Sequence, residues 1–69
     1  MIHIGDEIRF IINERKISIV DLAKSINCDR TNIYKILNKR TIDTDLLIRI
    51  SQALKFDFFQ MISDSMKKH

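Results

Sequence analysis

Side chains with hydrogen-bonding ends recur at helical spacing in the middle of the chain. Thr31, Tyr34, Lys35 and Asn38 stand at i, i+3, i+4 and i+7, with Arg30 at the edge of the same face. No carboxylate interrupts this face. Arginine and lysine donate to the guanine acceptors of the major groove, while threonine and tyrosine offer a methyl, a ring edge or a hydroxyl. A helix that presents such a face can lie in the major groove of DNA. We expect Arg30, Thr31, Tyr34 and Lys35 to contact bases there, and the alternative for Arg30 is a contact with phosphate.

Two short amphipathic helices joined by a turn are needed to position this surface. Their hydrophobic stripes are Leu22, Ala23 and Ile26 in the first helix and Ile33, Ile36 and Leu37 in the second. Asn27 stands at the end of the first helix, where a left-handed residue is wanted, and asparagine tolerates that conformation next best after glycine. Asp29 is expected to cap the second helix, which we place over residues 30–38.

This stretch resembles the helix-turn-helix of the phage-repressor and Cro-like family, whose members are often called XRE-type regulators. The family pattern is roughly L-A-x-x-x-G-V-S-x-x-x-I-x-x-x-E-x-G, and the chain aligns with it from Leu22-Ala23 through Asp29 to Lys39. Three positions depart from the pattern. Asn27 and Lys39 occupy usual glycine positions, and Leu37 occupies the usual glutamate position. The resemblance extends from Ile4 to Ile62.

The flanking sequence predicts three more helices, so the expected fold is an all-α, compact five-helix bundle that contains the helix-turn-helix. The first helix is expected from His3 or Gly5 to Arg15, the second after a cap at Ser18, the fourth after a cap at Asp43 or Thr44, and the fifth after a cap at Asp57. Residues 1–64 would form the DNA-binding domain. Residues 65–69 would form a short, basic and mobile tail.

The hydrophobic stripes of these helices predict the core. They are Ile4, Ile8, Ile11 and Ile12; Leu46, Leu47, Ile50, Ala53 and Leu54; and Phe56, Phe58, Met61 and Ile62. Phe10 lies off its stripe, so it either folds over a neighbouring side chain or contacts a partner, and Phe59 is expected to be exposed.

Relatives often pair an arginine on the first helix with the glutamate of the recognition helix. Ile12 and Leu37 hold those positions here, and we expect them to be buried and in contact, which avoids desolvating charges.

Composition limits the class of protein. The chain has 69 residues, which suffice for one small domain, and 45% of them are hydrophobic, with no proline and one glycine. The lone Cys28 cannot form an internal disulfide, which fits a reducing compartment, and we expect it to fill space in the core. No apolar stretch approaches the length of a membrane span and no signal peptide precedes the domain, so we expect a soluble, cytoplasmic protein without membrane contact.

The positive charge of the chain is concentrated in one segment. Twelve basic and nine acidic residues give a net charge of +3. Residues 29–41 contain four of the basic residues against Asp29 alone, and the rest of the chain contains equal numbers of both signs. The excess therefore sits on the predicted recognition helix and the loop after it, as expected for a surface that faces phosphates.

The resemblance implies a transcriptional regulator, most commonly a repressor, that binds double-stranded DNA as a homodimer on a pseudo-palindromic site. Phosphate contacts would come from Ser18 at the start of the second helix and from the loop residues Asn38, Lys39, Arg40 and Thr41. No cofactor, metal or small-molecule ligand is expected. A phage repressor, an antitoxin that represses its own operon and a host regulator all share this pattern, and so would a fragment of a longer regulator.

Two other classes of function compete with DNA binding. An enzyme is the weakest interpretation, because the sequence contains no nucleophile–base pair, no glycine-rich phosphate loop and no metal-ligand cluster, and therefore no candidate catalytic residue. The serious alternative is a protein-interaction module that keeps the helix-turn-helix fold without specific DNA binding, with Phe10 and Phe59 as contact residues. The basic recognition face favours DNA binding over this alternative.

Overall fold

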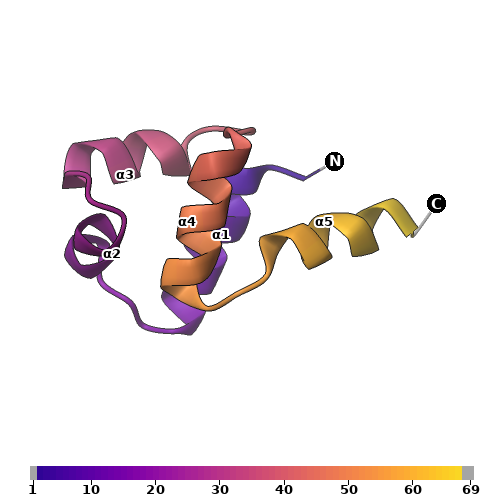
Figure 1. The fold of residues 1–69 in the computed structure, drawn as a ribbon, viewed down its shortest axis with the longest axis horizontal. Helices are drawn as coiled ribbons and strands as arrows, with labels where there is room; N and C mark the ends of the chain where they lie inside the picture. The colour runs from indigo at the N-terminus through magenta and orange to yellow at the C-terminus, as the bar shows by residue number, and fades with distance from the viewer. Residues whose placement is uncertain (1, 68–69) are drawn as a thin grey trace.

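The computed structural model describes residues 2–67, and within this range five α-helices follow one another without a strand (Figure 1). They are α1 (Ile4–Glu14), α2 (Ile19–Ser25), α3 (Arg30–Leu37), α4 (Thr44–Leu54) and α5 (Phe58–Lys67). The predicted all-α fold with five helices is confirmed. The molecule measures 37 × 20 × 20 Å, and it is elongated because α5 extends away from the other four helices (Figure 1).

Each helix begins at a residue that caps its free backbone amides. The predicted caps are confirmed at Ser18, Asp29, Asp43 and Asp57, whose side-chain oxygens accept hydrogen bonds from the amide three residues later at 2.8–3.0 Å. The cap of α1 was not predicted: His3 Nδ1 accepts a hydrogen bond of 3.1 Å from the Asp6 amide.

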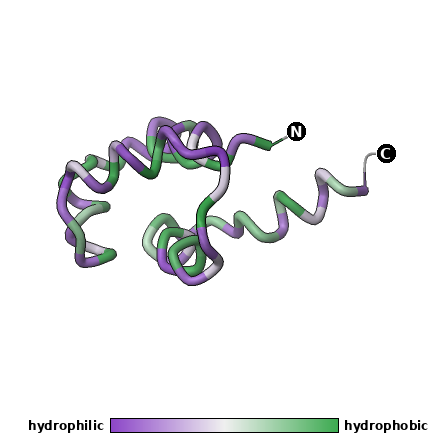
Figure 2. The backbone as a smooth tube through the Cα atoms, turned by 90° about the horizontal axis from the view of Figure 1, so that it is seen from above, coloured by the Kyte–Doolittle hydropathy of each residue, from purple (hydrophilic) through white to green (hydrophobic). Residues whose placement is uncertain are grey.

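One hydrophobic cluster lies between the helices, which are amphipathic along their length (Figure 2). Every predicted core residue of the first three helices is buried, as are Leu47, Ile50, Leu54 and Phe58. The remaining predicted residues pack at the edge of this cluster: Leu46, Ala53, Phe56, Met61 and Ile62. No charged or polar residue of the described part of the chain is fully buried.

Residues at the C-terminal end depart from the expectation. The predicted tail starts inside α5, which continues through Ser65 and Met66 to Lys67, so these residues are helical; Lys68 and His69 lie outside the described residues. The boundary at residue 64 therefore does not coincide with the end of a helix. Phe59 is exposed as predicted, and the ring of Phe10 is 59% exposed, so a neighbouring side chain does not cover it.

The Arg15 side chain connects the end of α1 to the end of α4 by hydrogen bonds. Its guanidinium Nη1 donates hydrogen bonds to the carbonyl oxygens of Leu54 at 2.9 Å and Lys55 at 3.1 Å, which lack partners within the helix. The same guanidinium lies 5.8 Å from the centre of the Phe56 ring. Arg15 itself remains exposed to solvent while it makes these contacts. No helix within residues 2–67 has the length and hydrophobicity needed to cross a membrane.

Candidate nucleic-acid interface

Helix α3 presents its polar side to solvent. Its three apolar residues are buried in the core, which fixes the rotation of the helix about its axis. The opposite side is exposed and carries the residues predicted to read bases: Arg30, Thr31, Tyr34 and Lys35. The structure therefore brings all four together on one accessible face. Arg30 and Thr31 are the first two residues of the helix, directly after the Asp29 cap.

The turn between α2 and α3 has the predicted geometry. Asn27 has φ 56°, in the left-handed region, and its amide donates to the Lys24 carbonyl at 3.2 Å. The next amide, that of Cys28, reaches back to the Ala23 carbonyl at 2.9 Å. These two bonds satisfy carbonyls at the end of α2 and turn the chain sharply into the cap of α3. The left-handed prediction for Asn27 is confirmed.

Ser18 lies at the start of α2 rather than on α3. Its hydroxyl oxygen accepts a hydrogen bond from the Asp21 amide at 3.0 Å. The hydroxyl proton is not used by this bond, so Ser18 keeps one donor that is exposed to solvent. The geometry allows a phosphate contact by that proton or by the backbone amides at the N-terminus of α2.

Backbone hydrogen bonds attach the loop after α3 to the start of α1. The amides of Ile4 and Gly5 donate to the carbonyl oxygens of Arg40 and Lys39, both at 2.9 Å. Gly5 is required here because a Cβ atom on it would overlap the Leu37 carbonyl and lie 2.7 Å from the Lys39 oxygen. The loop carbonyls therefore face α1. The side chains predicted to contact phosphate are exposed: Asn38, Lys39, Arg40 and Thr41.

A basic hollow of about 240 Å³ lies beside α3. Its charged lining residues are all cationic: Lys35 from α3, Lys39 from the loop and Arg49 from α4. Sequence reasoning missed Arg49, although it is the only basic residue of Thr44–Leu54. Asp43, which could have repelled phosphate at this end of α4, uses Oδ1 to accept from the Leu46 amide at 2.8 Å. The hollow offers three flexible cations to an anionic backbone.

Comparison with known proteins agrees with this geometry. A model of the Cro/C1-type HTH DNA-binding domain matches residues 7–64. The chain belongs to this family. The match begins within α1 and ends within α5, so it includes the helix-turn-helix, the residues of the basic hollow and all of α4. The resemblance noted in the sequence is confirmed. No curated protein and no solved structure gives a significant match to the chain.

An apolar pair lies at the two positions where a charged pair is expected in relatives of this Cro/C1-type domain. Ile12 and Leu37 are both buried, as predicted, and α1 packs against α3. Direct contact between the two side chains remains a prediction. Lys39, at the other usual glycine position, does not have a positive φ; among the described residues only Lys16, Asn27 and Lys55 do. A lysine therefore costs no backbone strain at position 39.

Cys28 lines the basic hollow of this Cro/C1-type domain and packs partly against its core. Burial raises the pKa of the Cys28 thiol above its ordinary value, Asp29 raises it further, and Arg49 partly opposes the rise. The thiol is therefore protonated at neutral pH and fills space, as predicted. Within residues 2–67, no three His, Cys, Asp or Glu side chains gather as a metal site requires.

Proposed function

We propose that this chain is a sequence-specific DNA-binding transcriptional repressor that inserts α3 into the major groove. The observation that carries the proposal is the exposed face of α3, on which Arg30, Thr31, Tyr34 and Lys35 stand together without a carboxylate. Arg30 donates to guanine O6 and N7 from the first turn of the helix. Lys35 reads a neighbouring base pair, and Thr31 and Tyr34 contact thymine methyls or phosphates.

Phosphate contacts hold the helix in register. We assign them to Ser18, Asn38, Lys39, Arg40 and Thr41, and we add Arg49 because it lines the same hollow as Lys35 and Lys39. Cationic and hydroxyl side chains around the recognition helix neutralise phosphates without distinguishing bases. The excess of positive charge in residues 29–41 supports this assignment.

We further propose that two copies bind a pseudo-palindromic site in the cytoplasm and repress by covering a promoter. Helix-turn-helix dimers place their recognition helices in successive major grooves about 34–36 Å apart. A homodimer would therefore select two half-sites separated by about one helical turn of DNA. Site selection from random DNA tests this directly, since an inverted repeat in the selected sequences identifies the dimer.

The experiment that tests the readers is site selection repeated with Arg30→Ala and Lys35→Ala. Arg30→Ala should cost about 1–3 kcal/mol on the best site and relax preference at one base pair of each half-site. Lys35→Ala should do the same at a neighbouring base pair. Arg9→Ala, which removes an exposed arginine from α1, is the matched control and should leave the selected motif unchanged. An unchanged motif for both α3 variants would overturn the assignment of Arg30 and Lys35.

A gel-shift series with bulk DNA separates this proposal from a protein-interaction module with the same fold. Binding through phosphates weakens steeply as salt concentration rises, because it releases counterions from DNA and this release is less favourable when the solution already contains more of them. The proposal predicts measurable binding at low salt and a linear fall in log affinity with log salt. Absence of any binding at low salt would favour the interaction module.

A further inference from the structure

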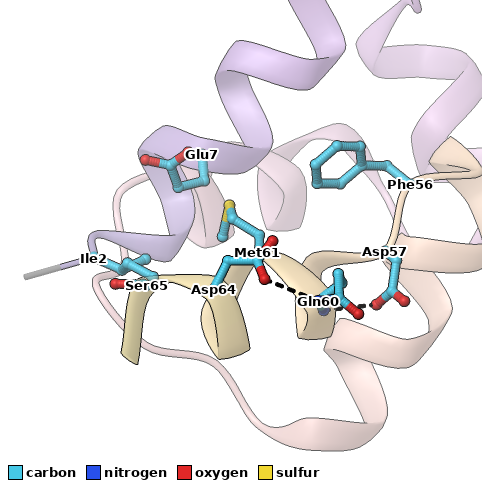
Figure 3. A pocket seen from close by; sticks show the side chains of 8 residues that line it. All are labelled: Ile2, Glu7, Phe56, Asp57, Gln60, Met61, Asp64 and Ser65. Carbon is cyan, nitrogen blue, oxygen red and sulfur yellow. Dashed lines mark hydrogen bonds between the residues drawn. The ribbon is translucent and has the colours of Figure 1, made fainter. Parts of the chain in front are cut away.

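A groove of about 550 Å³ separates α1 from α5 (Figure 3). Its apolar lining consists of Ile2, Phe56 and Met61, all partly buried. Phe56 is held in place from two sides. Its ring contacts the buried Phe58 ring edge-on, with 4.7 Å between centroids, and the guanidinium of Arg15 lies over it. The groove therefore has a fixed hydrophobic floor that is open to solvent.

The charged residues that line this groove are all acidic: Glu7, Asp57 and Asp64. Gln60 orients both aspartates (Figure 3). Its backbone amide donates to Asp57 Oδ1 and its side-chain Nε2 donates to Asp64 Oδ1, each at 2.9 Å. Each carboxylate still has lone pairs for further donors. Glu7 is partly buried and has no hydrogen bond or ion pair within the described residues, so its carboxylate is available to a cation brought beside it.

We infer that this groove binds a basic amphipathic helix of a partner protein. Such a helix would lay an apolar stripe on Ile2, Phe56 and Met61 and direct lysine or arginine side chains to the three carboxylates. Phe10 does not line the groove, but it lies about one turn beyond Glu7 on α1 and is exposed, so a partner helix that projects past the groove would meet it. This role would explain an exposed aromatic ring that the core does not use.

Charge and topology argue against two other occupants. A nucleic acid would be repelled by three carboxylates. The basic helix α3 of a second copy has its apolar residues buried in its own core, so it cannot supply the apolar stripe. The groove lies beside α5, and α3 lies at the opposite end of the molecule (Figure 1), so a partner helix in the groove leaves α3 accessible.

The probe is a synthetic peptide of about 16 residues, long enough to form a helix, with leucines at i, i+3, i+4 and i+7 and lysines flanking this stripe. Amide NMR spectra of the full chain should shift at Glu7, Gln60, Met61 and Ser65 when this peptide is added. A matched peptide with glutamate in place of lysine should cause no such shifts. Binding of both peptides alike, or shifts confined to α3, would overturn the inference.

A variant of the chain tests the acidic rim. The double substitution Glu7→Gln with Asp64→Asn keeps the size and one acceptor oxygen of each side chain but removes both charges, and it should weaken binding of the lysine peptide on the order of tenfold. Asp21→Asn, at an exposed acidic position on α2 outside the groove, should leave the affinity unchanged. Melting temperatures establish that all variants fold. Equal affinity for the double variant and the original chain would refute the role of the carboxylates, and neither result depends on DNA binding.

Discussion

The two hollows at opposite ends of this small domain have the same construction and opposite charge. The basic hollow surrounds the apolar side chains of Ile26, Ile36 and Leu46 with three cations, and the acidic groove surrounds Ile2, Phe56 and Met61 with three carboxylates. Both floors are edges of one hydrophobic cluster. The core therefore supports both surfaces, and the charged residues around each surface determine which partner it can bind. None of these charged residues is fully buried, although Asp57 also caps α5.

The two surfaces differ in how they are attached to that core. The rim of the basic hollow is held by backbone hydrogen bonds between α1 and the Lys39–Arg40 loop. The floor of the acidic groove is held by side chains, with Arg15 bonded to the end of α4 and stacked over Phe56. A substitution can therefore damage one surface and spare the other, depending on which attachment it removes. Four predictions test this separation, beginning with a change that should affect both sides.

Leu37→Ala should have the largest effect, because it opens a cavity where α3 meets the core. Leu37 is 2% exposed, and large-to-small changes at such sites cost about 2–5 kcal/mol of unfolding free energy. Urea denaturation followed by circular dichroism measures the loss. If Ile12 touches Leu37, a double-mutant cycle with Ile12→Ala should show coupling of at least about 0.5 kcal/mol. Additive effects would mean that the two residues are buried separately.

Gly5→Ala should damage the basic side by pushing α1 away from the loop. Replacing glycine inside a helix by alanine normally stabilises it by about 1 kcal/mol, but overpacking against backbone atoms costs about 1–3 kcal/mol. Here the added Cβ would meet the carbonyls of Leu37 and Lys39, so we expect net destabilisation and weaker binding to bulk DNA. Asn13→Ala, at an exposed position of α1, should be neutral or slightly stabilising. A raised melting temperature for Gly5→Ala would contradict the close approach.

Lys39→Ala should weaken DNA binding without changing stability or site preference. Removing one phosphate contact should lower the magnitude of the salt slope by about one unit. Arg40→Ala and Arg49→Ala are expected to behave in the same way. Lys67→Ala, at the far end of α5, is the matched control and should leave the slope unchanged. A changed site preference at constant slope would show that the residue reads bases.

Asn27→Gly should give the smallest effect, and its sign should be opposite to that of the others. Because Asn27 has φ 56°, glycine removes a steric cost, so the change should be neutral or stabilise the chain by up to about 1 kcal/mol. Asn13→Gly, in the last turn of α1, should instead destabilise by about 0.3 kcal/mol. The melting temperatures of the Asn27→Gly and Asn13→Gly variants distinguish these two effects. Two losses of similar size would count against left-handed strain at Asn27.

Local features of this fold could be predicted from sequence, and contacts between distant segments could not. Caps at Ser18, Asp29 and Asp57 and the left-handed Asn27 depend on a few neighbouring residues, so residue type alone indicates them. The exposed face of α3 follows from helical periodicity in the same way.

Four other features required the tertiary structure. Gly5 matters because of a carbonyl on α3, Arg15 because of carbonyls at the end of α4, and Arg49 because α4 lies beside α3. The acidic groove combines residues from both ends of the chain, and no local pattern brings those together. The extension of α5 to Lys67 was not predicted either. The helix starts from the Asp57 cap and the buried Phe58, and its residues from Ser65 onward extend a helix that is already formed.

Because of the hydrogen bonds at the start of α1, amide hydrogen exchange of this helix reports on the loop after α3. The first amides of a helix usually exchange quickly with deuterated solvent, because they have no partner within the helix. In this chain the amides of Ile4 and Gly5 are bonded to the carbonyls of Arg40 and Lys39, so their exchange requires the loop to separate from α1. Their two exchange rates therefore measure how often the loop opens. Any molecule that clamps the loop should slow both rates together, even though it touches neither residue.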